Sequence, residues 1–226
     1  MSAVPAGVGV PEPAARAAAA LPRVKRCLDV TVAAIALLVL SPLLVCLALA
    51  VRLSSPGPAI FRQERLGLHA QPFVLLKFRT MRTGVGEAVH RAYVTRLLTQ
   101  DDPPRGGAGG LFKLEDDPRV TRVGRWLRRT SLDELPQLVN VLRGEMSLVG
   151  PRPALAWEAA LYTDEQRLRF EVLPGITGLW QVSGRSRLSM REALALDVEY
   201  VRRRSLRLDV WILLRTLPTL VRPEAT

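Results

Sequence analysis

An apolar stretch, residues 30–51, is interrupted at its midpoint by Ser41-Pro42. The stretch is long enough for a helix to cross the roughly 30 Å hydrocarbon core of a bilayer. Proline has no N–H to bond to the carbonyl of Leu38, and its ring disfavours a helical Ser41, so the sequence predicts a bend at this point. The Ser41 hydroxyl or packed protein is expected to satisfy the backbone group that the bend leaves without a partner.

Basic residues lie on both sides of this stretch. Positive charge marks the cytoplasmic side of a membrane segment, and here both flanks carry it. A segment over residues 23–53 that enters the membrane, bends and returns to the same face therefore fits better than one that crosses. The remainder, residues 54–226, is expected to form one compact unit on the cytoplasmic surface of a membrane. The flanking basic residues are Arg23, Lys25 and Arg26 on one side and Arg52, Arg62 and Arg65 on the other.

The net charge of +11 suits nucleic acid, anionic lipid or phosphorylated small molecules as partners. Aromatic residues make up only 5% of the chain and are not interleaved with basic ones as in a base-stacking surface. We therefore favour a membrane surface and phosphate ligands, and we expect no nucleic acid partner. Cys27 and Cys46 have neither disulfide nor metal-site spacing. The Ala- and Pro-rich residues 1–22 are interpreted as a disordered tail and not as a signal peptide.

Helical patterns dominate the chain after the apolar stretch, so the expected fold class is mainly α with a few short β-strands (α+β). Short strands are predicted at 60–61 and 73–78. Residues 101–110 are predicted to be a loop without the ending of a nucleotide-binding P-loop. Helices are predicted at 87–99, 119–129, 137–143, 157–170, 190–203 and 206–221.

The densest group of charged residues is 128–137 (RRTSLDELPQ). One interpretation is structural, because Ser131 and Glu134 have the spacing of a capping box. Pro136 weakens it, since a helix starting at Ser131 would lose a backbone bond there. Either the helix is kinked beside the two acids, or it begins near Pro136 and leaves Asp133 and Glu134 on the preceding turn. Two adjacent acids beside arginines are typical of phosphoryl transfer, in which one carboxylate attacks phosphorus and the other holds a divalent cation.

Two further positions, Arg152 and Arg185, are candidates for anion binding. Arg152 lies between two prolines that restrict its backbone, which suits a fixed guanidinium fork on a phosphate; a surface polyproline turn is the alternative. Arg185 ends the Gly-rich segment 174–185 and is placed to clamp an anion, although a structural turn fits as well. Asp197 and Glu199 lie in the next helix, where a solvated face is the simpler interpretation.

These segments, taken in order, resemble the bacterial sugar transferases, which are monotopic phosphoglycosyl transferases. The resemblance covers about residues 23–222, and the block from SLDELPQL to PRP is highly specific. Two departures stand out: Arg203-Arg204-Ser205 replaces a frequent Asn-x-Ser, and 82–115 matches no motif and is a candidate variable substrate loop. The matching segments are KRCLD (25–29), the Ser41-Pro42 break, PAIFRQERLG (58–67), KFRTM (77–81), residues 117–153, PGITGLWQVSGR (174–185) and residues 196–209.

The resemblance implies a role for each matched position. Asp133 would be the nucleophile and Glu134 its partner, with Mg²⁺ held at this pair. Asp197 matches an acidic position near the site, and Ser41-Pro42 matches the re-entrant membrane helix. The phosphate-binding residues would be Lys77, Arg79, Arg128 and Arg152.

The function implied is transfer of a sugar-1-phosphate from a UDP-sugar to polyprenyl (undecaprenyl) phosphate. The reaction would pass through a phosphosugar-aspartate intermediate, release UMP and initiate assembly of an exopolysaccharide, O-antigen or glycoprotein glycan. The expected location is the cytoplasmic face of a bacterial plasma membrane, and the chain resembles the minimal catalytic form of the family. The alternative is a non-catalytic, basic scaffold or lipid-binding protein on the membrane surface. The sequence leaves open the sugar, the glycan and whether the chain forms a homo-oligomer.

Overall fold

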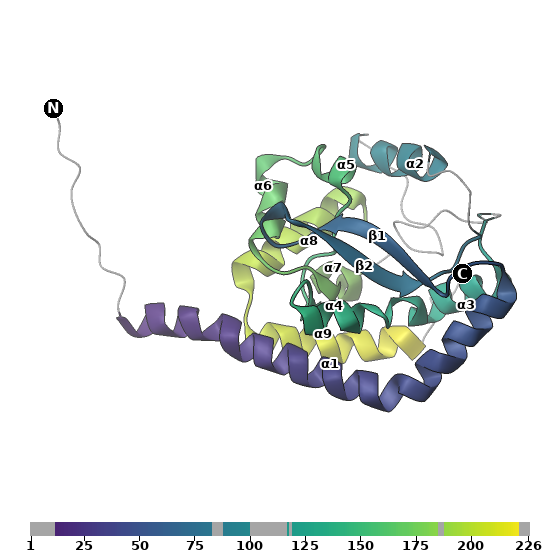
Figure 1. The fold of residues 1–226 in the computed structure, drawn as a ribbon. Helices are drawn as coiled ribbons and strands as arrows, with labels where there is room; N and C mark the ends of the chain where they lie inside the picture. The colour runs from purple at the N-terminus through teal and green to yellow at the C-terminus, as the bar shows by residue number, and fades with distance from the viewer. Residues whose placement is uncertain (1–11, 83–87, 100–116, 118, 185–187, 222–226) are drawn as a thin grey trace.

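The computed structural model describes residues 12–82, 88–99, 117, 119–184 and 188–221. One long helix, α1 (Glu12–Ser54), runs beneath a body of shorter helices and two small sheets (Figure 1). The predicted fold class, mainly helical with a few short strands, is confirmed. The loop predicted at 101–110 lies outside the described residues.

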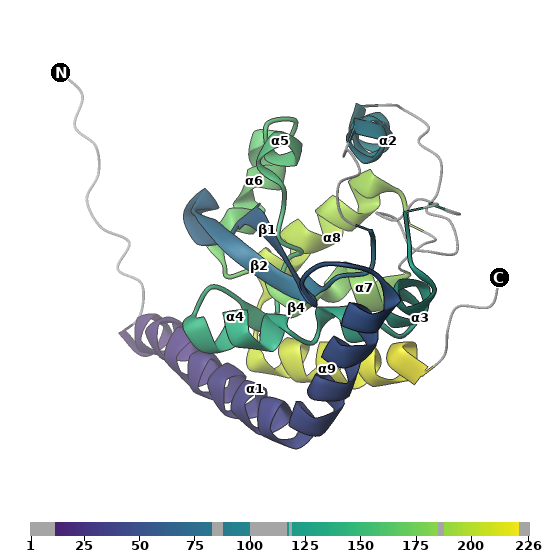
Figure 2. The same ribbon diagram turned by 45° about the vertical axis from the view of Figure 1, so that its right-hand side comes forward.

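The helix α1 consists of two arms that meet at a sharp bend, as Figures 1 and 2 show from two directions. The Ser41 hydroxyl donates a 2.8 Å hydrogen bond to the carbonyl oxygen of Leu38, the group that Pro42 cannot bond. The predicted bend and its predicted backbone partner are therefore confirmed. Residues 12–22 belong to the helix, whereas the sequence analysis placed them in a disordered tail; their alanine content, which favours helix, explains the difference.

The first arm of α1 is tied to the body by polar contacts. Lys25 pairs with Asp209 of the last helix at 2.6 Å. Arg26 donates hydrogen bonds to the carbonyl oxygens of Val141 and Leu142. Asp29 accepts hydrogen bonds from the Ser147 hydroxyl and the Leu148 N–H. The KRCLD segment thus has two roles: it fixes α1 to the body, and it places positive charge beside the apolar stretch.

Two small sheets position the loops of the body. Strand β1 (Ile60–Leu66) pairs antiparallel with β2 (Pro72–Phe78) through a connection containing η1 (Leu68–Ala70). The second sheet, which the sequence analysis did not predict, is a parallel pair of β3 (Ser147–Val149) and β4 (Gly175–Thr177). A Cβ on Gly175 would lie 2.0 Å from the backbone nitrogen of Gly150, so only glycine permits these two chain segments to approach so closely.

The predicted helices are confirmed except in one segment. Where one helix was expected over 157–170, the chain forms α5 (Ala156–Ala159), α6 (Asp164–Arg167) and η3 (Leu168–Glu171). Thr163 caps the N-terminus of a new helix, α6: its side chain accepts a hydrogen bond from the N–H of Gln166, and the Gln166 side chain accepts one from the N–H of Thr163. This capping box interrupts the single helix that was predicted. The other elements are α2 (Ala88–Thr99), α3 (Arg122–Thr130), η2 (Leu132–Glu134), α4 (Gln137–Arg143), α7 (Leu179–Ser183), α8 (Met190–Arg203) and α9 (Leu206–Val221).

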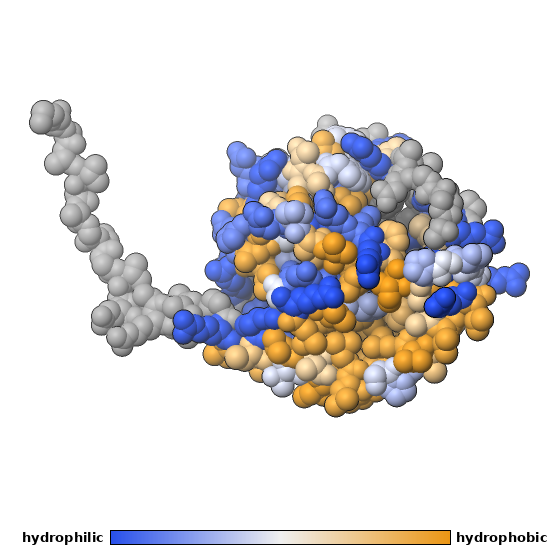
Figure 3. Space-filling model, viewed as in Figure 1, coloured by the Kyte–Doolittle hydropathy of each residue, from blue (hydrophilic) through white to orange (hydrophobic). Residues whose placement is uncertain are grey.

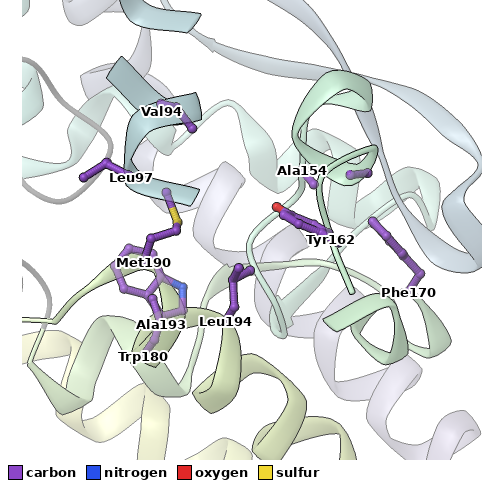
Figure 4. Close-up of a cluster of buried hydrophobic side chains, with 10 residues drawn as sticks. Val94, Leu97, Ala154, Tyr162, Phe170, Trp180, Met190, Ala193 and Leu194 are labelled. Carbon is purple, nitrogen blue, oxygen red and sulfur yellow. The ribbon is translucent and has the colours of Figure 1, made fainter. Parts of the chain in front are cut away.

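Hydrophobic clusters join these elements. In the cluster of Figure 4, Val94 and Leu97 of α2 pack with Met190 and Leu194 of α8 and with Trp180 of α7. Removing each such side chain from water contributes roughly 1.5–3 kcal/mol. A second cluster includes Ala33 on the first arm of α1, and a third joins the second arm to β2 and α3 through Leu47, Val51, Phe78 and Leu127. Both arms of α1 therefore share a core with the body.

A large apolar surface remains on the outside of α1 and α9 (Figure 3). The most apolar 18-residue stretch within Arg23–Ser54 has a mean hydropathy of 2.8, and by length and composition the segment could cross a membrane. Contiguous exposed apolar surface of this kind marks a membrane or protein contact. The exposed apolar side chains are Val32, Ile35, Leu38, Val39, Leu43, Val45, Leu49 and Leu53 on α1, and Val210, Trp211, Leu214 and Leu217 on α9.

Candidate active site

The Asp133-Glu134 pair lies on a short turn between α3 and α4. Ser131 has a left-handed backbone (φ 55°) that ends α3, and its side chain makes no capping bond. The capping-box interpretation is therefore wrong. The second of the two alternatives is confirmed: α4 begins at Gln137 after Pro136, and both acids fall on the preceding turn, η2.

Asp133 is buried, with 4% of its surface exposed, and Oδ1 has no hydrogen-bond partner in the described residues. Oδ1 of Asp197 and Oε1 of Glu158 also lack a hydrogen bond, but the second oxygen of each of those carboxylates accepts one, whereas none is found for Asp133 among the described residues. Leaving a buried carboxylate without a partner costs free energy. Glu134 follows it and is partly exposed. The turn thus presents one buried and one more accessible carboxylate.

Two cations lie near these acids, at the end of β2 and in α3, two elements that both contact η2. Lys77 Nζ lies 5.2 Å from the centre of the Phe61 ring. Burial and the charge of Arg65 lower the pKa of Lys77 to about 8, and the Asp133 carboxylate opposes this shift. Burial also lowers the pKa of Arg128, again opposed by Asp133. Asp133 therefore stabilises the charged forms of both cations.

Close backbone packing holds α3 against the end of β2. Arg128 Nε donates a 2.9 Å hydrogen bond to the Thr80 hydroxyl, and the N–H of Thr121 donates to the Thr80 carbonyl. A Cβ on Gly124 would lie 2.1 Å from that carbonyl oxygen, so glycine is required there. The KFRT segment and the helix that precedes the acids are consequently fixed to one another.

Asn140, fully buried in α4, connects the acidic turn to the strand of Lys77. Its amide oxygen accepts from the N–H of Leu76 at 3.1 Å, and its amide nitrogen donates to the carbonyl of Val74 at 2.7 Å. The Asn140 side chain thus makes, to the backbone of Leu76 and Val74, the two hydrogen bonds that a neighbouring strand would make to β2. The sequence analysis missed Asn140, although a polar residue on the apolar side of a short helix was a possible signal.

The predicted phosphate-binding Arg79 occupies a different place. Its guanidinium donates hydrogen bonds to the carbonyl oxygens of Ser55 (2.6 Å) and Pro56 (2.5 Å), just after α1, and to Val51 at 3.4 Å. The side chain is buried, with 4% of its surface exposed. In this structure Arg79 closes the end of α1, and it is not part of the group around Asp133.

Arg152 and Asp197 belong to a second group of residues. Asp197 is 2% exposed and pairs at 2.6 Å with Arg169, whose guanidinium also donates to the backbone carbonyl of Arg152. Asp197 therefore does not lie on a solvated face, whereas exposed Glu199 does and pairs with Arg203. Sequence analysis missed Arg169; a charged residue between the apolar Leu168 and Phe170 was its only signal. Arg185 lies outside the described residues.

Comparisons with known proteins agree with this architecture. The profile of the family described as bacterial sugar transferase matches residues 21–223. The galactosyl transferase CpsE of Streptococcus agalactiae is 43% identical over 194 residues, which are 85% of this chain and 41% of that protein. The UDP-glucose:undecaprenyl-phosphate glucose-1-phosphate transferase of Caulobacter vibrioides is 44% identical over 214 residues, 89% of this chain and 73% of that protein.

The exopolysaccharide production protein ExoY of Sinorhizobium fredii is 41% identical over 194 residues, 86% of this chain and 84% of that protein. The chain thus spans about two fifths of the streptococcal relative and most of the other two. The match extends from the first arm of α1 to α9 and includes the turn with Asp133 and Glu134. The chain belongs to the bacterial sugar transferase family.

Proposed function

We propose that this chain transfers a sugar phosphate from a UDP-sugar to polyprenyl phosphate and releases UMP. The observation that carries the proposal is Asp133, a buried carboxylate with an oxygen that has no hydrogen-bond partner among the described residues, beside Glu134 and near Lys77 and Arg128. Such an oxygen can attack without first breaking a hydrogen bond. The name of the Caulobacter relative specifies UDP-glucose and undecaprenyl phosphate, which supports the same two substrate classes here.

The reaction has two steps at one site. In the first, an Asp133 oxygen attacks the sugar-linked phosphorus of the donor, the bond from that phosphorus to the bridging oxygen breaks, and UMP leaves. In the second, a phosphate oxygen of the polyprenyl phosphate attacks the same phosphorus and Asp133 is released. The products are UMP and a polyprenyl-diphosphate sugar, and Asp133 is regenerated. Lys77 and Arg128 offset the repulsion between the carboxylate and the diphosphate, where positioning and electrostatics dominate catalysis.

The two acids fit a magnesium ion. Mg²⁺ is usually held by one or two carboxylates together with substrate phosphates; the partly exposed Glu134 and one oxygen of Asp133 offer such ligands and leave the other oxygen of Asp133 to attack. Asp133 and Glu134 would hold the ion, and when bound it would supply positive charge at the diphosphate. The protein groups keep their own tasks: Asp133 attacks, and the cations Lys77 and Arg128 orient the phosphates.

The apolar surface of α1 and α9 supports a site at the cytoplasmic face of a bacterial membrane. We propose that the bent α1 enters the bilayer and returns, because a straight crossing would carry Lys25 and Arg26 to the far side, away from their partners on the body. The reaction would there begin the assembly of a membrane-bound glycan. The name of the exopolysaccharide production protein among its relatives is consistent with such a pathway.

The test of the activity is UMP release by the detergent-solubilised protein from a panel of UDP-sugars. Without acceptor, we expect about one UMP per protein molecule and an intact mass increased by one sugar phosphate. Adding polyprenyl phosphate should remove the adduct and permit continuous turnover. The Asp133→Asn protein should show neither adduct nor turnover. Absence of UMP release with every donor would instead favour the scaffold alternative.

The test of the topology uses a single cysteine introduced at positions 2–20 after Cys27 and Cys46 are replaced by serine. In intact cells it should be shielded from a membrane-impermeant thiol reagent. In a Ser41→Leu, Pro42→Leu variant the helix can straighten, and part of the population should react. Labelling of the protein with the native bend from outside the cell would show that the segment crosses the membrane.

A further inference from the structure

We propose that Arg169 is a positioning residue that fixes the backbone of Arg152, and that Asp197 acts on the reaction by holding the same backbone, through Arg169 and directly. The inference rests on the proposed function, in which Arg152 binds a substrate phosphate. Arg169 lies in η3 with 4% of its surface exposed. A guanidinium so deeply buried cannot itself meet a substrate without a large rearrangement, so its effect must pass through the groups that it contacts.

The guanidinium of Arg169 joins three parts of the molecule. Nη2 donates 2.6 Å hydrogen bonds to the carbonyl oxygen of Arg152 and to Oδ2 of Asp197 in α8. Nη1 donates a 2.9 Å bond to the Tyr162 hydroxyl. The Tyr162 ring stacks on Phe170 at 6.3 Å between ring centres, inside the core cluster shown in Figure 4. Arg169 therefore ties the loop of Arg152 to a packed part of the core.

The loop that carries Arg152 is held at four successive carbonyl oxygens. The oxygen of Pro151 accepts from the N–H of Gly175 at 2.8 Å, and that of Ala154 accepts from the N–H of Leu66 at 2.8 Å. The two oxygens between them accept from buried arginines: that of Arg152 from Arg169, and that of Pro153 from Arg65 at 3.2 Å.

This arrangement explains how a backbone contact controls a side chain. Pro153 restricts Arg152 before it to an extended backbone, Pro151 fixes its own φ, and the bond to the Arg152 carbonyl restricts this backbone further. The Cα–Cβ direction of Arg152 is then set, and only its side-chain rotamers vary. A guanidinium on a fixed backbone loses less conformational entropy when it binds a phosphate.

Asp197 supplies the charge that makes this arrangement possible. A buried guanidinium without a counter-ion is costly, and the carboxylate of Asp197 lies 2.6 Å away. Burial raises the pKa of Asp197 to about 6, while the charge of Arg169 and a hydrogen bond from the backbone of Arg152 oppose the shift. The carboxylate thus interacts with Arg169 and with the backbone of Arg152, which explains an acid near a site for anionic substrates without requiring that it contact them.

The experiment is a double-mutant cycle between Arg169→Lys and Arg152→Ala, measured as kcat/KM for UMP release with saturating acceptor. Lysine keeps the charge for Asp197 but loses the planar fork. Alone, Arg169→Lys should lower kcat/KM by about 10- to 100-fold, the range expected for a lost charge-assisted hydrogen bond. In the Arg152→Ala background it should cost less than about twofold more, because the residue through which it acts is gone. Losses that multiply in full would overturn the proposal.

Two further variants separate positioning from folding. Tyr162→Phe removes a different hydrogen bond of the same guanidinium and leaves the one to Arg152, so kcat/KM should stay within about twofold of the wild type. Asp197→Asn should lose activity less than Arg169→Lys, and that loss should also vanish in the Arg152→Ala background. If Asp197→Asn reduces activity equally in both backgrounds, Asp197 acts independently of Arg152 and the inference is wrong. Full activity of Arg152→Ala alone would remove the phosphate role of Arg152 and this inference with it, while UMP release by the wild type would still support the proposed reaction.

Discussion

The turn that carries Asp133 and the loop that carries Arg152 deal with buried polar groups in opposite ways. In the loop, four successive carbonyls are bonded and the nearby Asp197 is paired with Arg169. In the turn, Ser131 has a left-handed backbone, and no hydrogen bond or ion pair is found for Asp133 among the described residues, whereas Asp197 lacks a hydrogen bond only at Oδ1. Partnered groups make a rigid loop, whereas a carboxylate without a partner is available to a ligand. The first region holds a side chain in place, and the second has the features of the reactive site that we propose.

The contrast extends to every buried aspartate in the described part of the chain. Four of the five have partners: Asp29 with Ser147 and Leu148, Asp117 with Arg119, Asp197 with Arg169, and Asp209 with Lys25 and Tyr200. Asp133 is as deeply buried as these four, yet no hydrogen bond or ion pair is found for it among the described residues. Oδ1 of Asp197 also lacks a hydrogen bond, but its Oδ2 is paired with Arg169. Burial alone therefore does not set Asp133 apart from the other buried aspartates; the lack of a partner for the whole carboxylate does.

The largest expected effect comes from making the same substitution in both regions. Asp133→Asn removes the nucleophile, so turnover should fall by at least about 10⁴-fold, as for the nucleophiles of other covalent enzymes. Its melting temperature should be unchanged or higher, because a buried charge without a partner is gone. UMP release and differential scanning calorimetry measure the two quantities.

Asp197→Asn should give the reverse pattern and serves as the control. It leaves the Arg169 charge uncompensated, which typically costs about 3–5 kcal/mol of the free energy of unfolding. Its turnover at a temperature where it remains folded should exceed that of Asp133→Asn by a wide margin. If the two variants lose stability and turnover to the same extent, the distinction between the two regions fails.

The next effect concerns the partner of the nucleophile. Glu134→Gln should lower turnover by roughly 10²- to 10³-fold and raise the Mg²⁺ concentration needed for half-maximal activity, since an anionic oxygen ligand is lost. Glu199→Gln is the matched control, because Glu199 pairs with Arg203 on an exposed face. Its activity should remain within about twofold of the wild type. Wild-type activity that survives chelation by EDTA would exclude a magnesium ion from the reaction.

A smaller effect, on stability and not on catalysis, is expected from Arg79→Lys. The lysine cannot reproduce the fork that closes the end of α1, so the free energy of unfolding should fall by about 2 kcal/mol. The KM for the donor should change by less than about threefold, and Arg62→Lys on the exposed surface is the control. A tenfold rise in KM at unchanged stability would instead return Arg79 to the phosphate-binding group that the family resemblance implies.

The smallest effect is a change in pH dependence. A lysine is charged below its pKa, and that of Lys77 is lowered to about 8. The charged fraction of Lys77 therefore falls as the pH rises through 8, and kcat/KM for the donor should fall with it. Lys77→Arg keeps its charge to above about pH 12, so this decline should disappear while activity at pH 7 changes only a few-fold. A decline of the same size at the same pH in both proteins would show that another group titrates.

Sequence reasoning succeeded where the signal was local. The helices at 137–143 and 190–203 follow from periodicity, the bend from Pro42, and the turn with Asp133 and Glu134 from Pro136 after it. The pair β3–β4 was missed because strands of three residues, joined across a long separation, carry no periodic signal. The position of Arg79 depends on where α1 ends in space, and that of Asp197 on Arg169, and neither could be read from spacing.

The hydrogen bond at the bend of α1 has a consequence for the order in which the protein assembles. Ser41 and Leu38 are three residues apart, so this bond can form as soon as the segment has been synthesised. Lys25 and Asp209 are separated by 184 residues, so the docking of α1 on the body must wait until α9 exists. We expect the membrane segment to take its bent shape during synthesis and to serve as a template on which the remainder folds. Thiol accessibility of ribosome-bound chains truncated before α9 would test this order: the tail should already be shielded while the body is still incomplete.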